Sequence, residues 1–93
     1  MKTYTITLAN IARSYELLPA DSHKSFWNKA HVFEMADGTK VLRSYSTYVA
    51  IIDKDGNLFR SWWGWSATTG RHIKSFMGLN KKGYESLEYV QVR

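Results

Sequence analysis

The sequence predicts an α+β fold: a small antiparallel sheet, made of a three-strand meander plus an N-terminal strand, with one amphipathic helix packed on it. Three observations lead to this class. Residues 3–8 alternate polar and apolar side chains, two Asp-Gly pairs separate strand-like runs between residues 26 and 63, and residues 66–78 combine helix caps with a helical apolar period. A chain of 93 residues is expected to build one core, so we assign residues 1–93 to a single domain.

The N-terminal strand has the clearest pattern. Threonines alternate with Tyr4, Ile6 and Leu8, which gives one polar and one apolar face. Residues 9–25 are ambiguous, because their apolar side chains have helical spacing but Pro19 and the polar residues after it end a helix quickly. The sequence leaves a short helix or an ordered loop open for this segment.

The meander is predicted from its turns. Residues 26–35 are rich in aromatic and branched side chains and are followed by an Asp-Gly turn at 37–38. Residues 41–52 resume the strand pattern, and the apolar run near their end predicts a central strand. A second Asp-Gly turn, at 55–56, leads into a third strand at residues 58–63.

The segment SATTGRHIKSFMG has the features of one helix. Ser66 suits the N-cap, Thr69 in the first turn supports it, and Gly78 suits the terminating position. The apolar positions that should face the sheet are Ile73, Phe76 and Met77.

The outer side of this helix is basic, because Arg71 and Lys74 lie on one stripe. Asn80 is expected to cap one more short helical turn that runs to about residue 86. Residues 89–92 are then expected to return as a strand.

The positive charge is concentrated in one stretch. The formal charge is +5, and residues 58–84 hold five basic side chains and no acidic one, together with three tryptophans. Cations neutralise phosphates and flat rings stack on bases, so this composition predicts a nucleic-acid surface. The predicted contact residues are Arg60, Trp62, Arg71, Lys74, Lys81 and Lys82. A solvated basic face over a tryptophan core is the structural alternative.

Trp62 and Trp63 are neighbours on a predicted strand and should point to opposite faces. If the helix covers the face of Phe59 and Trp63, Arg60 beside Trp62 forms a flat surface of cation and ring. Such a surface stacks on bases or anchors a protein partner. In the alternative, Trp62 is also covered.

His72 has two interpretations. It could be the general base of a small hydrolase, since several serines and threonines offer hydroxyls, but no spacing among them requires a catalytic triad. It could instead lie at the edge of the core and make one hydrogen bond to a strand, which is the commoner role for such a histidine.

Several classes are excluded by what the sequence lacks. It contains no cysteine, which removes disulfides, thiolate nucleophiles and cysteine-based metal sites and suits a reducing cytoplasm. Its longest apolar run, residues 48–52, is far too short to span a bilayer, so no membrane association is expected. The histidines are scattered, and the DKDGN stretch at 53–57 lacks calcium-loop spacing, so no metal or cofactor is expected.

Three stretches carry a family resemblance: KSFWNKAHV at 24–32, SYSTYVAIID at 44–53 and WGWSATTGRHIKSF at 63–76. They resemble short uncharacterised proteins that phages and other mobile elements of Gram-positive bacteria carry, with an SF-aromatic-x-KA segment and an SATTxxHIxxF helix motif. The similarity covers residues 24–79. It implies a mobile-element context in a bacterial cytoplasm, and no particular chemistry.

We therefore expect a non-enzymatic accessory binding protein that contacts nucleic acid. The alternative from a different class is a protein-interaction module that inhibits a host defence complex by binding an acidic host protein. A small hydrolase built on His72 is the weaker third hypothesis. The sequence leaves the oligomeric state open, with a homo-oligomer as one alternative.

Overall fold

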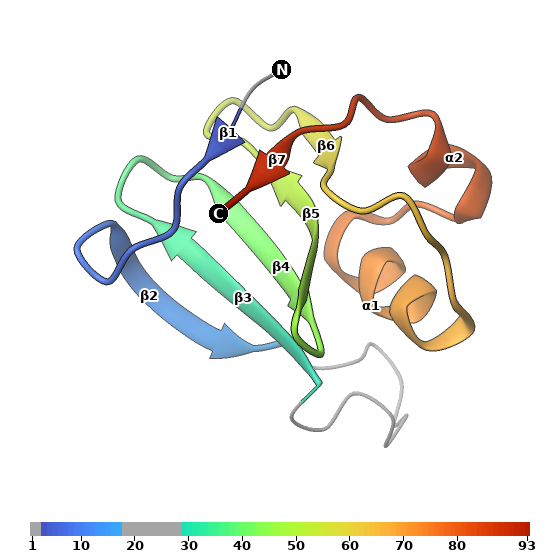
Figure 1. Ribbon diagram of the computed structural model, residues 1–93, viewed down its shortest axis with the longest axis horizontal. Coiled ribbons are helices and arrows are strands. Elements are labelled where there is room, and N and C mark those ends of the chain that lie inside the picture. Colours follow the sequence, from blue (N-terminus) through green and yellow to red (C-terminus); the bar gives the residue numbers. More distant parts are fainter. Residues whose placement is uncertain (1–2, 18–28) are drawn as a thin grey trace.

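The computed structural model describes residues 3–17 and 29–93. Five strands form an antiparallel sheet in the order β2-β3-β4-β5-β6, so strands consecutive in sequence are neighbours in space (Figure 1). The short strands β1 and β7 form a separate parallel pair. The elements are β1 Thr3–Tyr4, β2 Ile11–Glu16, β3 Ala30–Met35, β4 Lys40–Ser44, β5 Thr47–Ile52, β6 Leu58–Arg60, α1 Ala67–Met77, α2 Lys81–Glu85 and β7 Gln91–Val92. The α+β class is confirmed, with a meander of five strands instead of three.

Both predicted Asp-Gly turns are present. Gly38 and Gly56 have φ angles of 97° and 87°, which glycine adopts without steric cost. Asp37 Oδ1 accepts a hydrogen bond from the Thr39 N–H at 2.9 Å, and this bond is the main reason why the pKa of Asp37 is lowered. The first turn joins β3 to β4 and the second joins β5 to β6, and β5 lies between β4 and β6, as predicted for a central strand.

The prediction of one strand over residues 41–52 is wrong. The chain reverses at Tyr45 and Ser46, and β4 pairs with β5 through this two-residue turn. The backbone of Tyr45 has a φ of 55°, a value that residues other than glycine, asparagine and aspartate rarely adopt. No glycine or asparagine marks the turn in the sequence, so the local pattern gave no signal for it.

The N-terminal third also differs from the prediction. Residues 11–16 form the edge strand β2, neither a helix nor a loop, because they pair with β3. The strand expected at residues 3–8 is only Thr3–Tyr4, and it pairs with β7 instead of joining the meander. Leu8 is 93% exposed in the turn that follows. The parts of the predictions that fall on residues 18–28 lie outside the described residues.

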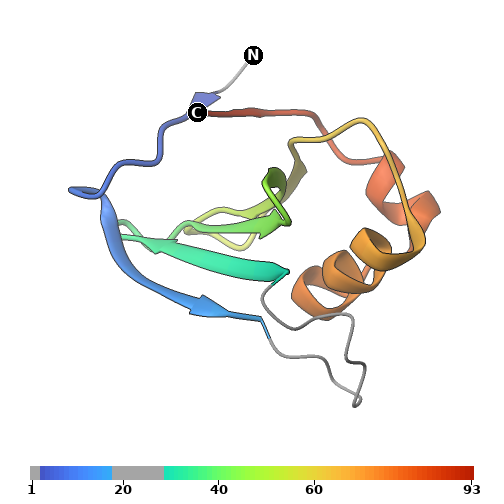
Figure 2. The same ribbon diagram turned by 60° about the horizontal axis from the view of Figure 1, so that its bottom comes forward.

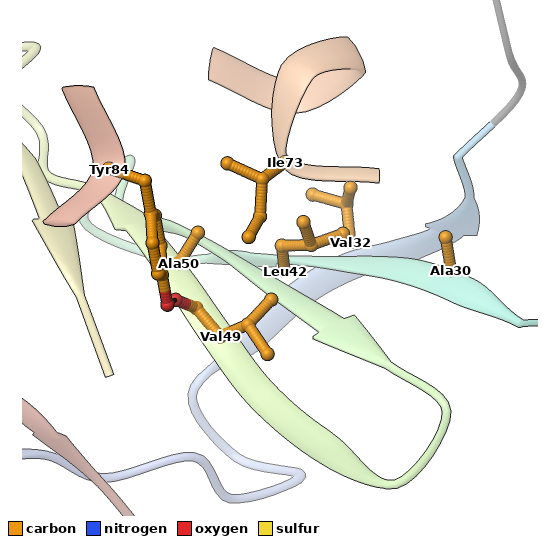
Figure 3. Packing of buried hydrophobic residues seen from close by; sticks show 7 residues of the cluster. All are labelled: Ala30, Val32, Leu42, Val49, Ala50, Ile73 and Tyr84. Atoms are coloured by element: carbon orange, nitrogen blue, oxygen red, sulfur yellow. Dashed lines mark hydrogen bonds between the residues drawn. The ribbon is translucent and has the colours of Figure 1, made fainter. Parts of the chain in front are cut away.

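Two apolar clusters lie on opposite faces of the sheet. Val41 on β4 contributes to the cluster under β1 and β7, whereas its neighbour Leu42 contributes to the cluster under α1. Figure 2 shows these two layers on either side of the central strands. Figure 3 shows how Ile73 from α1 and Tyr84 from α2 meet the sheet residues of the larger cluster. The sheet is therefore covered on both faces.

Both helices have the predicted caps. The Ser66 side chain accepts from the Thr69 N–H at 3.2 Å, and Gly78 ends α1 in the left-handed conformation with a φ of 76°. Asn80 caps α2 by accepting from the Gly83 N–H at 2.9 Å. No helix in the described ranges is long and apolar enough to span a membrane.

Candidate functional site

The exit of β6 carries an aromatic and cationic surface that we call the Trp63 platform, made of Arg60, Trp63 and Tyr89. The indole of Trp63 stacks on the ring of Tyr89 with centroids 4.4 Å apart and planes 8° from parallel. The Arg60 guanidinium carbon lies 4.4 Å from the centroid of the Trp63 ring. Trp63 remains 63% exposed despite both contacts. More than half of its surface is therefore accessible to solvent beside these two partners.

Backbone pairing fixes the platform. Tyr89 is the bridge partner of Arg60, and the Arg60 N–H donates to the Glu88 carbonyl at 3.0 Å. The Val90 N–H in turn donates to the Arg60 carbonyl at 2.8 Å. The segment before β7 therefore lies along β6, and this pairing brings Tyr89 under an indole that is 26 residues away in the sequence.

Tyr84 supports the platform from inside. Its ring is fully buried, and its hydroxyl donates to the Val49 carbonyl at 2.6 Å and lies 3.1 Å from the Trp62 carbonyl. Burial raises the pKa of Tyr84, so the hydroxyl keeps its proton as a donor. This side chain connects α2 to β5, where Figure 3 shows Tyr84 reaching Val49, and its hydroxyl also contacts the residue just before Trp63.

The structure matches the alternative in which Trp62 is covered, and the exposed tryptophan is Trp63. Trp62 is partly buried and packs against the larger apolar cluster, while Trp63 is exposed. A Cβ at Gly64 would lie 2.5 Å from the Trp62 ring, so the indole occupies the space that a side chain at residue 64 would need. Strand β6 ends at Arg60, so the alternation of side chains along a strand does not determine the directions of Trp62 and Trp63.

The other predicted cations lie on the two helices. Arg71 and Lys74 are exposed on α1, and Lys81 and Lys82 are exposed in the first turn of α2. Within the described residues the single ion pair joins Arg13 and Glu34, so none of the four is paired to a carboxylate there. These residues lie on neighbouring elements of the chain and not at the platform itself.

Two exposed acidic residues lie close in sequence to Tyr84 and Tyr89, just beyond the basic stretch 58–84. Glu88 precedes Tyr89, Glu85 ends α2, and both are exposed. The pairing of residues 88–90 with β6 brings this acidic segment beside Arg60. The local charge is therefore less positive than residues 58–84 alone would give.

His72 belongs to a buried polar network. Its Nδ1 lies 2.8 Å from Ser44 Oγ on β4, and Ser44 Oγ lies 3.0 Å from Thr69 Oγ1. His72 is 0% and Ser44 2% exposed, so the histidine makes the predicted bond to a strand. Ile73 is buried beside it and Phe76 packs against the same cluster, as the apolar period predicted.

The burial of this network bears on catalysis. A hydrolytic serine must present its hydroxyl to a substrate, whereas Ser44 is covered by α1. In the part of the chain that is described, no three acidic, histidine or cysteine side chains gather as metal ligands.

A cavity of about 370 Å³ lies elsewhere, between the N-terminal segment and the β3–β4 turn. Its lining residues are Thr3, Tyr4, Thr5, Ile6, Asn10, Met35, Ala36, Asp37, Thr39 and Val41. It contains none of the residues that the sequence nominated for binding.

Sequence reasoning missed Trp63, Tyr89 and Tyr84 as members of the site. Alternation indicated that one of the two neighbouring tryptophans is exposed, but could not choose between them. Tyr89 and Tyr84 become part of the site only through pairing of distant segments, for which the sequence carries no local signal.

Comparison with known proteins places the chain in a family. No curated protein and no solved structure matches it. A family model described as a family of unknown function, DUF8033, matches residues 13–91, which include most of β2, all of β3 to β6, both helices, the whole Trp63 platform and the buried network around His72. The chain therefore belongs to DUF8033, a family of unknown function.

Proposed function

We propose that this chain is a non-enzymatic accessory protein that binds nucleic acid through the Trp63 platform, assisted by the cations of α1 and α2. The observation that carries the proposal is the exposed, preformed stack of Trp63 and Tyr89 with the Arg60 guanidinium, within the most basic part of the chain. Flat rings stack on bases and guanidinium groups neutralise phosphates, and a platform that is already ordered loses little conformational entropy when it binds.

The biological context belongs to the same proposal. The resemblance over residues 24–79 supports an origin in phages or other mobile elements and a location in the bacterial cytoplasm. The genes around family members test this: phage or mobile-element genes are expected as neighbours, and a constant chromosomal neighbourhood would contradict it.

The binding is tested by a salt series with labelled oligonucleotides, followed by fluorescence anisotropy. Phosphate contacts make the affinity fall as salt rises, so the dissociation constant should increase strongly between about 50 and 200 mM salt. Replacing Lys81 and Lys82 together by glutamate should weaken binding and flatten the salt dependence, since both are exposed. The matched control is Lys54→Glu, an exposed cation at the β5–β6 turn. Affinity that does not respond to salt, or equal losses in the variants, contradicts the proposal.

The second candidate is a protein-interaction module that inhibits a host protein complex. Tryptophan, tyrosine and arginine are the residues that dominate the centres of protein interfaces, and the Trp63 platform contains one of each. Glu85 and Glu88 also favour it, because exposed carboxylates repel phosphates but are accommodated by a protein of mixed charge.

Capture from nuclease-treated host lysate separates the two candidates. A protein that is retained by the wild type and lost with Trp63→Ala supports the interaction module. Loss of all captured material after nuclease treatment supports nucleic acid. A hydrolase is not proposed, because Ser44 and His72 are buried.

A further inference from the structure

We propose that Tyr45 and Lys29 form a second contact for nucleic acid, in which the Lys29 ammonium and the Tyr45 hydroxyl hold a backbone phosphate. The inference rests on the proposed function and adds a site to it, at the turn between β4 and β5. Tyrosine hydroxyls and lysine ammonium groups are common donors to phosphate oxygens, and such contacts position a nucleic acid without reading its sequence. Neither residue belongs to the set that the sequence predicted for binding.

The backbone conformation of Tyr45 is costly for a tyrosine. Its φ of 55° is left-handed, and in that region the Cβ of a residue crowds the carbonyl oxygen that follows it. Glycine or asparagine would meet the demand of the turn at a lower cost. The pairing of β4 with β5 therefore explains a left-handed residue here, but it does not explain a tyrosine. Strained residues of this kind cluster at functional sites, which makes Tyr45 a candidate for binding.

The Tyr45 side chain lies at the surface beside a cation. The residue is 50% exposed, although its ring centroid lies 6.1 Å from that of His72 on α1. Lys29 Nζ lies 5.9 Å from the centroid of the Tyr45 ring, and the Tyr45 N–H donates to the Lys29 carbonyl at 2.6 Å. The single ion pair among the described residues joins Arg13 and Glu34, so no carboxylate there neutralises Lys29. The backbone bond thus keeps an exposed hydroxyl-bearing ring and an uncompensated ammonium together.

The second site lies at the same end of the sheet as the Trp63 platform. Strand β6 is antiparallel to β5, so its exit runs back toward the β4–β5 turn, and the Ser61 N–H donates to the Val49 carbonyl at 3.1 Å on the way (Figure 1). Helix α1 packs against this end too, because His72 contacts both Ser44 and Tyr45. The helix contains two exposed cations and no acidic residue. The platform, α1 and the turn are therefore neighbours at one end of the sheet.

The test measures the affinity of a short labelled DNA duplex by fluorescence anisotropy across a salt series. Lys29→Gln should weaken binding and make the slope of log affinity against log salt shallower by about 0.9, the value for one phosphate contact. Tyr45→Phe keeps the ring and removes only the hydroxyl. It should weaken binding by about 2- to 13-fold, the range for loss of one hydrogen bond.

The matched controls are Lys54→Gln and Tyr15→Phe. Lys54 is an exposed cation at the β5–β6 turn. Tyr15 is an exposed tyrosine on the edge strand β2, and the Arg13 guanidinium carbon lies 5.1 Å from its ring centroid. Each control removes the same group as its test variant, and neither should change the affinity or the salt slope.

Two further substitutions separate binding from folding. Tyr45→Asn and Tyr45→Ala both remove the ring and the hydroxyl, so both should weaken binding at least as much as Tyr45→Phe. They differ in the backbone, because asparagine tolerates the left-handed conformation and alanine does not. Tyr45→Asn should therefore unfold at a higher urea concentration than Tyr45→Ala, and at one no lower than the wild type, as followed by circular dichroism.

Four outcomes overturn the inference. Wild-type affinity in Lys29→Gln and Tyr45→Phe, together with weaker binding in Trp63→Ala, refutes the second contact and leaves the proposed function intact. Wild-type affinity in Tyr45→Asn with unfolding at a lower urea concentration means that the ring serves only to pack on His72. Equal losses in the test variants and their controls mean that no local site exists at the turn. If the duplex does not bind at low salt, the proposed function fails and the inference fails with it.

Discussion

Removal of the Ser44 hydroxyl tests whether the polar network around His72 is structural. Ser44→Ala deletes two contacts, one of 2.8 Å to His72 Nδ1 and one of 3.0 Å to Thr69 Oγ1. Both partners lose a hydrogen bond at a place where water cannot replace it, because His72 is 0% and Thr69 only 5% exposed. A buried polar group that loses its partner costs about 1–3 kcal/mol. Since two groups are affected, we expect Ser44→Ala to lower the free energy of unfolding by about 2–6 kcal/mol.

Thr69→Val provides the matched comparison. This change keeps the shape of the side chain and removes only the 3.0 Å contact, so the shorter bond between Ser44 and His72 remains. The expected loss is about 1 kcal/mol. Urea unfolding curves followed by circular dichroism measure both values. The network does not stabilise the fold as argued if the free energy of unfolding of Ser44→Ala lies within about 0.5 kcal/mol of the wild-type value. The same holds if Thr69→Val lowers the free energy of unfolding more than Ser44→Ala does.

Two further variants test the packing that supports the platform. Tyr84→Phe should cost about 1–2 kcal/mol at neutral pH, because the Val49 and Trp62 carbonyls lose their donor. The folded protein holds the Tyr84 proton more tightly than the unfolded chain, so this stabilisation is complete below pH 10.0 and is lost as the pH rises above it. Urea unfolding at pH 7 and above pH 10 should show the difference between wild type and variant shrinking, and a constant difference would contradict the assignment. Gly70→Ala should destabilise by about 1–3 kcal/mol despite the better helix propensity of alanine, because the new Cβ would lie 2.5 Å from the Trp65 ring, and a stabilised variant would refute this packing.

The parts of the fold that were predictable are those with local causes. The Asp-Gly turns at 37–38 and 55–56 and the caps Ser66, Gly78 and Asn80 depend on side chains within a few residues of the backbone that they fix. The periodicity of α1 was equally visible, because a helix that covers a sheet must keep its apolar side chains on one face.

The errors have physical causes too. The strand β2 lies at the edge of the sheet, where Ala12, Arg13, Ser14 and Tyr15 are all exposed. A strand without a buried face lacks the alternation by which strands are recognised. The Tyr45 turn was missed because its left-handed backbone is imposed by the pairing of β4 and β5, which overrides the preference of the residue.

The site shows the same division between local and long-range information. That Arg60 and a neighbouring tryptophan form a cation–ring surface follows from residues close together in sequence. Two long-range features make Trp63 this tryptophan and give it Tyr89 as its support. Strand β6 ends at Arg60, and residues 88–90 pair with that strand. Alternation applies only inside a strand, so it fails one residue beyond the last ladder bond.

This pairing also changes the electrostatic argument. The sequence places five cations in a stretch without acids, but the fold pairs the backbone of Glu88, whose side chain is exposed, with the backbone of Arg60. An exposed carboxylate in this paired segment repels phosphates that approach the platform, so we expect fewer phosphates to be neutralised than the count of cations suggests. On a single strand, five neutralised phosphates would give a slope of log affinity against log salt of about −3.5, at about −0.7 for each. The structure therefore favours a shallower slope, which should steepen when Glu88→Gln removes the repulsion. A steep slope that Glu88→Gln leaves unchanged would mean that the phosphates pass along the outer faces of α1 and α2, away from the Trp63 platform.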